Sequence, residues 1–162
     1  MNKNLKQEII FMIFILLAYC IGVGVVALDY PEKVIIKMTT PNLEHLETEQ
    51  ELDDFILTEC DQTEVGDFAY CIREFAVKHY KYNITEKAIS HLDLFKTGGD
   101  CKSWSKFYFD LGEKAGFTAN QTYLFQNFGN KGHVFTILYD ENLDYCILEN
   151  ESVRCFKSVR NG

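Results

Sequence analysis

Basic residues are scarce in this chain: 16 lysines and arginines stand against 24 aspartates and glutamates, a formal net charge of −8 at pH 7. The first eight residues hold two of the lysines and one glutamate, so the remaining 14 basic and 23 acidic residues give a net charge of −9. No basic stripe with interleaved aromatic residues occurs. Because a phosphate backbone repels an acidic domain, we expect no nucleic-acid partner.

The chain also lacks cysteines and histidines at the spacing that is typical of metal sites. Its cysteines form no Cys-x-x-Cys pair, the spacing that holds zinc in many small domains. His45, His79 and His91 have no partner at ligand spacing, and we interpret them as structural or exposed. The acidic runs at 44–47 and 49–51 are interpreted as a solvated helix face. We therefore expect neither a metal nor another cofactor.

Charge is absent altogether from one segment, residues 9–28, which are twenty consecutive apolar or small residues. About twenty such residues span a hydrocarbon core. Lys3 and Lys6 precede the segment, so the positive-inside rule places residues 1–8 in the cytoplasm. We expect an uncleaved signal anchor that holds the chain in the cell membrane by a single pass.

The rest of the chain, residues 29–162, would then lie outside the cytoplasm as a short stem, 29–40, and one domain, 41–162. No repeat, low-complexity segment or long linker divides it. A secreted chain is the alternative, since Val25-Val26-Ala27 offers a signal-peptide cleavage site. The apolar region of such peptides, however, usually runs only about 7 to 15 residues.

Hydrophobic periodicity predicts helices in the first part of this domain and strands in the second. Thr40-Pro41 fits an N-cap followed by proline at the first helical position. The predicted helices are 41–57, 64–79, 85–95 and 101–115, and the predicted strands are 122–125, 134–139, 145–148 and 153–159. Helices followed by strands indicate an α+β fold with an antiparallel sheet.

The Gly-rich turn Gly98-Gly99 leads into the helix predicted from Cys101. Apolar residues at helical spacing place Cys101 on the inward side of that helix, near its unpaired backbone N–H groups. A helix N-terminus favours a thiolate and supplies donors for an oxyanion, as a nucleophilic cysteine requires. The alternative is a small buried hydrophobic residue or half of a disulfide.

Two later residues could complete such a site. His133 begins one predicted strand and Glu149 ends the next, with turn residues at 140–142 between the strands. In an antiparallel hairpin those two ends lie side by side. A carboxylate there could orient the imidazole while the other ring nitrogen faces the thiol.

The number and spacing of the cysteines independently indicate that Cys101 is unpaired. Five cysteines follow the apolar segment, an odd number in a compartment where disulfides form. If Leu148 and Val153 flank the last turn, Cys146 and Cys155 face each other across a hairpin, which favours their pairing. Cys60 and Cys71, separated by a short acidic loop, are the natural second pair, so Cys101 is predicted to be free.

These motifs resemble the transglutaminase-like superfamily of papain-type enzymes, and they are most similar to its bacterial transglutaminase-like cysteine proteinases. Three blocks carry the resemblance in the family's order and spacing, over roughly residues 64–151: Gly99-Asp100-Cys101, His133-Val134-Phe135 and Leu148-Glu149-Asn150. The family usually has Asp where Glu149 stands and acidic residues at Lys102 and Ser103. Asn150 is an alternative orienting residue, as Asn is in papain-like enzymes.

The resemblance implies a papain-like fold in which a catalytic cysteine at a helix N-terminus packs on an antiparallel sheet. It implies a Cys101, His133 and Glu149 triad that cleaves peptide or amide bonds through a thioester acyl-enzyme. We therefore expect a membrane-anchored, extracytoplasmic cysteine peptidase with a protein or peptide substrate. The alternatives are a protein-glutamine acyltransferase and a catalytically inactive binding domain of the same fold.

Overall fold

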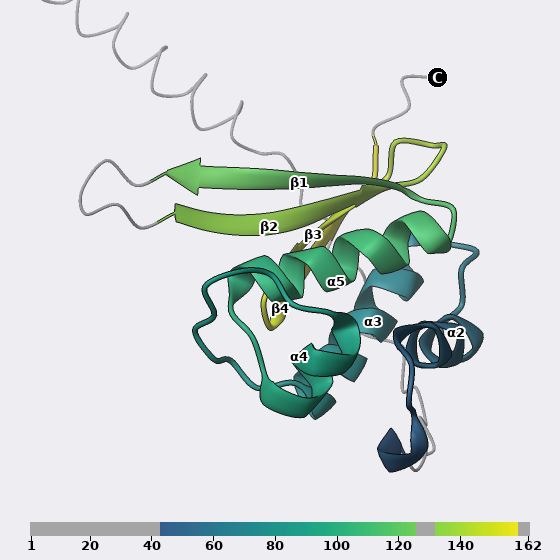
Figure 1. Ribbon diagram of the computed structural model, residues 1–162. Coiled ribbons are helices and arrows are strands. Elements are labelled where there is room, and N and C mark those ends of the chain that lie inside the picture. Colours follow the sequence, from purple (N-terminus) through teal and green to yellow (C-terminus); the bar gives the residue numbers. More distant parts are fainter. Residues whose placement is uncertain (1–42, 126–131, 159–162) are drawn as a thin grey trace, which may run out of the picture.

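The computed structural model describes residues 43–125 and 132–158, which form helices followed by a four-stranded sheet (Figure 1). The elements are the 3-10 helix η1 (Leu43–His45), α2 (Glu49–Glu59), α3 (Val65–His79), α4 (His91–Thr97), α5 (Cys101–Lys114), β1 (Thr118–Phe125), β2 (Gly132–Tyr139), β3 (Tyr145–Glu149) and β4 (Ser152–Phe156). This order confirms the predicted α+β class with an antiparallel sheet.

The sheet follows the chain in the order β1-β2-β3-β4, and each neighbouring pair is antiparallel. In β2, Val134, Thr136 and Leu138 are buried, and they alternate with less buried residues. Figure 1 shows α5 lying along one face of the sheet, with the other helices on the same side of it. The buried side of β2 therefore faces α5.

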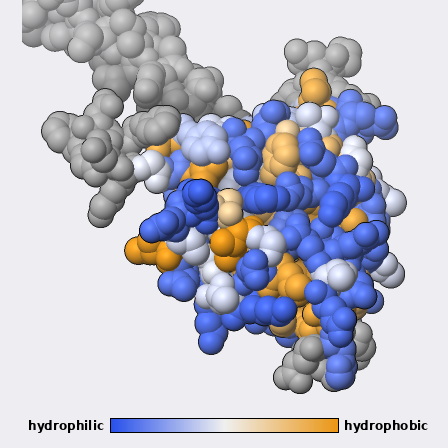
Figure 2. All heavy atoms as spheres, in the orientation of Figure 1, coloured by the Kyte–Doolittle hydropathy of each residue, from blue (hydrophilic) through white to orange (hydrophobic). Residues whose placement is uncertain are grey.

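The core lies between α3, α5 and that face of the sheet. Its largest fully buried side chains are aromatic, and they come from the apolar sides of the two helices: Phe68, Phe75, Trp104, Phe107 and Tyr108. Gly112 lets α5 approach the sheet closely, because a Cβ there would overlap the Leu138 side chain. Figure 2 shows a mostly hydrophilic surface on this side of the molecule, broken by separate apolar patches.

The prediction of one helix over 41–57 is wrong. Residues 43–45 form a 3-10 turn, and α2 begins only at Glu49. Thr48 and Glu51 form a capping box there: the Glu51 amide donates to Thr48 Oγ1 (3.2 Å) and the Thr48 amide donates to Glu51 Oε2 (3.1 Å). The capping box fixes the helix start, and Thr40-Pro41 lies outside the described residues.

The helix predicted over 85–95 is also displaced. It is α4, which begins at His91 because Ser90 Oγ accepts a hydrogen bond from the Asp93 amide (3.1 Å). The chain before it is not helical: Tyr82 forms a parallel bridge with Gly99. By contrast, α3 and α5 begin and end within a residue of their predicted bounds.

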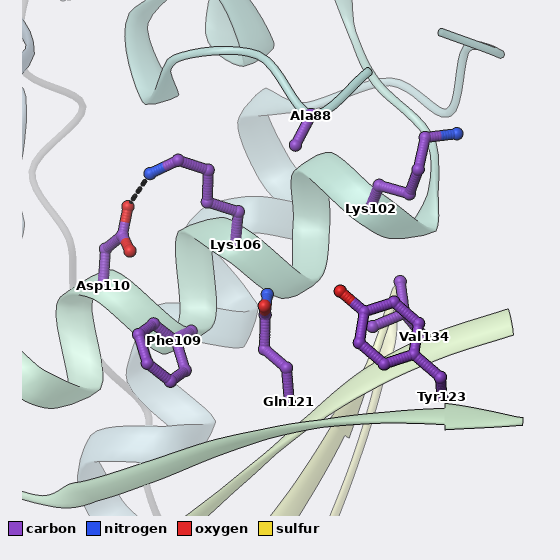
Figure 3. Close-up of a pocket in the computed structure, with 8 residues that line it drawn as sticks. All are labelled: Ala88, Lys102, Lys106, Phe109, Asp110, Gln121, Tyr123 and Val134. Carbon is purple, nitrogen blue, oxygen red and sulfur yellow. Dashed lines mark hydrogen bonds and ion pairs between the residues drawn. The ribbon is translucent and has the colours of Figure 1, made fainter. Parts of the chain in front are cut away.

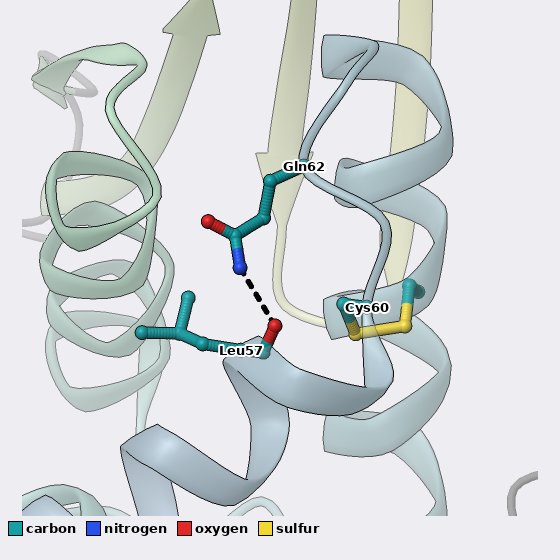
Figure 4. The surroundings of a disulfide bond; sticks show 4 residues. Leu57, Cys60 and Gln62 are labelled. Carbon is teal, nitrogen blue, oxygen red and sulfur yellow. Dashed lines mark hydrogen bonds between the residues drawn. A yellow bond between two sulfur atoms is a disulfide. The ribbon is translucent and has the colours of Figure 1, made fainter.

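The structure contains both disulfides that the sequence predicts. Cys60–Cys71 joins the end of α2 to α3 (Figure 4), with 5.6 Å between the Cα atoms. Cys146–Cys155 links β3 to β4 at directly paired positions, with 4.0 Å between the Cα atoms. Cys101 is the free cysteine of the described chain.

No helix in 43–125 or 132–158 is long and apolar enough to cross a membrane. The predicted transmembrane segment, 9–28, and the predicted stem, 29–40, lie outside the described residues.

Candidate functional site

Cys101 is the first residue of α5, and the turn before it is built for close backbone packing. Gly98 has φ +76°, and a Cβ there would overlap the Lys81 carbonyl oxygen. The Gly99 amide donates to the Lys81 carbonyl (2.9 Å), and Trp104 Nε1 donates to the Gly99 carbonyl (3.0 Å). These contacts fix the position at which the helix starts.

The charged groups beside the thiol come from the N-cap. Asp100 accepts a hydrogen bond from the Lys102 amide (3.1 Å), and its carboxylate also pairs with the Lys102 ammonium. Burial raises the pKa of Asp100, but the Lys102 hydrogen bond and the other donors outweigh it, so that pKa lies below its usual value. Asp100 is therefore an anion that caps α5. The Cys101 thiol is half-buried and forms no disulfide.

Helix α5 places Cys101 over the beginning of β2. One turn further along the helix, Thr136 Oγ1 donates to the Ser105 carbonyl (2.7 Å), and the two hydroxyls lie 2.8 Å apart. Cys101 lies four residues before Ser105 on α5, and Val134 lies two residues before Thr136 on β2. Four helical residues and two strand residues cover similar lengths, so Cys101 and Val134 lie at the same end of the sheet.

His133 and Glu149 meet at that end. Their Nε2 and Oε1 atoms lie 2.9 Å apart, and the side chains are 31% and 47% exposed. The distance is that of an ion pair, but the direction is not that of a hydrogen bond, so Nε2 is enclosed without a hydrogen-bond partner. The hairpin thus brings the predicted base and the predicted orienting carboxylate together.

The thiol does not join this pair. His133 alternates along β2 with Val134 and Thr136, which are buried beneath α5, so its side chain leaves the strand on the opposite face. Among the described residues, no hydrogen bond joins Cys101 to His133 or Glu149. The three predicted residues therefore share one end of β2 without forming a connected triad.

The β3–β4 turn that carries Glu149 is held from two helices. Tyr108 of α5 donates its hydroxyl to the Asn150 carbonyl (2.6 Å), and Arg73 of α3 donates Nε to the Glu151 carbonyl (2.7 Å). Asn150 adopts a left-handed conformation with φ +48°. Its Oδ1 is buried without a hydrogen-bond partner, so the alternative orienting residue contacts neither His133 nor Cys101 by a hydrogen bond.

A pocket of about 320 Å³ opens between α5 and the sheet (Figure 3). Two of its lining residues are the chain neighbours of the candidate site residues: Lys102 follows Cys101, and Val134 follows His133. The others are Ala88, Lys106, Phe109, Asp110, Gln121 and Tyr123. The sequence could not indicate this pocket, because four separate segments line it.

His91 is a further buried charged residue whose partners sequence spacing could not reveal. Its Nδ1 lies 2.6 Å from Asp53 Oδ1, and its Nε2 lies 3.1 Å from Asp110 Oδ2. Burial lowers the pKa of His91, but the hydrogen bonds to Asp110 and Asp53 outweigh it and raise that pKa above its usual value. Each ring nitrogen faces a carboxylate oxygen, and an ionised carboxylate only accepts hydrogen bonds, so these contacts favour an imidazolium that donates from both nitrogens.

The same cluster offers three groups at metal-binding distances, Glu49, His91 and Asp110. In the structure both ring nitrogens of His91 contact carboxylates, so a metal bound there would have to replace the contact between His91 Nε2 and Asp110 Oδ2. Lys114 and Lys106 also pair with the carboxylates of Asp53 and Asp110. The cluster is an ion network that joins α2, α4 and α5.

Comparison of the chain with known proteins found no matching family model, no matching curated protein and no matching solved structure.

Proposed function

We propose that this chain is a transglutaminase-like cysteine peptidase that cleaves peptide or amide bonds with Cys101 as its nucleophile. The observation that carries the proposal is a free cysteine at the first residue of α5, at the same end of β2 as the His133–Glu149 ion pair. Nucleophile, base and orienting carboxylate are the groups that this chemistry needs.

The reaction follows from the groups present. His133 Nε2 faces Glu149, so Nδ1 is the nitrogen that takes the Cys101 proton. The thiolate attacks the substrate carbonyl carbon, a C–S bond forms, and the Cys101 N–H donates to the oxyanion, because the next three amides of α5 already donate to Asp100. Collapse breaks the C–N bond, and the leaving amine takes the proton from His133. Water then hydrolyses the thioester, returning the thiol and releasing the acid.

One rearrangement is required before this reaction can occur. His133 leaves β2 on the face opposite α5, so its ring must turn across the strand end to reach Cys101. Catalytic hydrogen bonds are often long or misaligned in a free enzyme and tighten when substrate binds.

The separation of Cys101 from the His133–Glu149 pair favours a second candidate, a non-catalytic binding domain that keeps the fold. A protein-glutamine acyltransferase would share every step up to the thioester and differ only in using an amine to resolve it. We favour hydrolysis because the sequence is most similar to the cysteine proteinase branch.

We also propose that the domain lies outside the cytoplasm on the anchor at 9–28. The two disulfides support this location, because disulfides persist in oxidising compartments and are rare in the cytosol. Protease added to intact cells should remove the domain. Full protection would contradict the topology, and a mature chain beginning near residue 28 would replace the anchor with a signal peptide.

The reactivity of the Cys101 thiol tests the proposed function. The full chain, kept non-reduced so that both disulfides stay closed, is labelled with iodoacetamide in parallel with a free cysteine peptide at the same pH. Because the full chain also contains Cys20, the label is counted on the fragment that carries residue 101. We expect faster labelling of that fragment than of the peptide, a slower rate in His133→Ala and none on that fragment in Cys101→Ala. A rate equal to that of the peptide and unchanged in His133→Ala would contradict a peptidase and favour the binding domain.

A further inference from the structure

We propose that the pocket beside Cys101 binds the side chain of a glutamate in the substrate, with Lys106 as its cationic contact. The inference deepens the proposed function and rests on it in one respect, that the substrate is a peptide lying across the start of α5.

The position of the pocket suits a substrate side chain. Lys102, the residue after Cys101, and Val134, on the face of β2 that packs against α5, both line it, so it adjoins Cys101 on that side of the sheet, whereas His133 lies on the other side. Successive residues of an extended peptide are about 3.3 Å apart. A peptide with its reacting carbonyl at Cys101 can therefore place a nearby side chain in this pocket.

The lining suits an aliphatic stem with a charged end. Ala88, Phe109 and Val134 give it apolar walls, whereas the polar groups come from two lysines, Asp110, Gln121 and Tyr123. Figure 3 shows Lys106 rising from α5 above Gln121, with the Tyr123 ring between the sheet and the helix. A glutamate has two methylenes for the walls and a carboxylate for the polar groups.

Of the two lysines that line the pocket, Lys106 has the ammonium group with fewer contacts. The Lys102 ammonium already donates to the Thr85 carbonyl (2.9 Å) and pairs with Asp100. Lys106 pairs with Asp110, and that carboxylate is shared with His91 Nε2 at 3.1 Å. Asp110 therefore contacts both Lys106 and His91, and His91 also pairs with Asp53 at 2.6 Å. An ammonium has three donors, so Lys106 can hold Asp110 and still donate to a guest carboxylate.

The overall charge of the domain makes such a preference diagnostic. With a net charge of −9 beyond its first eight residues, the chain repels acidic peptides at long range. Non-specific electrostatics would thus disfavour glutamate. A preference for glutamate over glutamine, its neutral isostere, must come from a local contact.

The experiment compares matched peptides that carry Glu, Gln or Lys at each position near the cleaved bond. The ratio kcat/KM is measured for the full chain, and peptide binding to Cys101→Ala is measured by fluorescence anisotropy. We expect Glu to be preferred over Gln by about tenfold at one position in both assays. In Lys106→Met the preference should disappear.

Lys114→Met is the matched control. Lys114 is also on α5 and also pairs with a carboxylate that contacts His91, but it does not line the pocket. It should keep the preference for Glu. Lys106→Gln, which keeps a polar end, serves as a second variant if Lys106→Met unfolds, and thermal melting of each variant checks folding.

The outcomes separate this inference from the proposed function. Turnover or binding with equal preference for Glu and Gln, or equal loss in the Lys106 and Lys114 variants, overturns the glutamate pocket and leaves the peptidase in place. Lys106-dependent binding of the Glu peptide to a chain that turns over no peptide supports the pocket and overturns the peptidase. Absence of both binding and turnover overturns both.

Discussion

Replacing His91 with leucine should destabilise the domain strongly, because it leaves carboxylates in the core without their cation. The His91 side chain is fully buried and that of Asp53 is 1% exposed. Removing one partner of a buried ion pair costs about 3–5 kcal/mol. Lys114 and Lys106 remain beside the two carboxylates, so we take the lower end, about 3 kcal/mol.

A loss of about 3 kcal/mol is a large share of the 5–15 kcal/mol by which domains are usually stable, and it lowers the melting temperature by about 10 °C. The assay is thermal unfolding of the non-reduced protein followed by circular dichroism. His45→Gln is the control, because His45 is exposed and should melt like the parent.

The pH dependence of stability supplies a second readout. The pKa of His91 is raised in the folded protein, so its contribution is complete below the unfolded value of about 6.5 and is lost as the pH rises through the folded pKa. The pKa of Asp110 is lowered despite its burial, because His91 and Lys106 donate to it. Its contribution is therefore present above about 3.9 and is lost as the pH falls through the folded pKa.

The parent should thus lose stability as the pH is raised above about 6.5, and His91→Leu should show less of this decline. A variant that loses under about 1 kcal/mol, or that keeps the parent's decline between pH 6 and 9, would refute the imidazolium network.

Three further substitutions test the packing around the candidate site. Gly112→Ala should cost about 1–3 kcal/mol in thermal unfolding, because its Cβ would overlap Leu138; a neutral effect would mean that the helix can shift. Gly98→Ala should cost at least about 1 kcal/mol from its positive φ and should also slow Cys101 labelling; an unchanged rate would separate the turn from the thiol. Tyr108→Phe should cost about 1 kcal/mol by removing the donor to Asn150, and unaltered melting would show that this hydrogen bond contributes nothing.

Local patterns predicted the elements that are decided by local interactions. Helical periodicity located α3 and α5, and Gly116 follows the end of α5 in a left-handed conformation, with φ +91°. The hairpin register followed from treating Leu148 and Val153 as partners, which also paired Cys146 with Cys155. The start of α2 was missed, although the capping box at Thr48 was visible in the sequence.

Contacts between residues far apart in the chain could not be predicted from the sequence. The carboxylates that hold His91 lie 38 and 19 residues away in the chain, so no spacing rule relates them to it. For the candidate site, the hairpin correctly placed Glu149 beside His133. The face on which His133 lies could also have been predicted, because strict alternation along the strand puts it opposite the buried positions Val134, Thr136 and Leu138.

The most direct test of the central claim is the turnover of one peptide substrate by single variants of the candidate triad. We predict that Cys101→Ala and His133→Ala abolish turnover, because neither a thiolate nor its base can be spared. Glu149→Gln should lose about tenfold to a thousandfold, since it keeps an acceptor but no longer stabilises the imidazolium. All three should melt like the parent. If Glu149→Gln is fully active while Asn150→Ala is not, Asn150 is the orienting residue; if His133→Ala turns over substrate as fast as the parent, the account is contradicted.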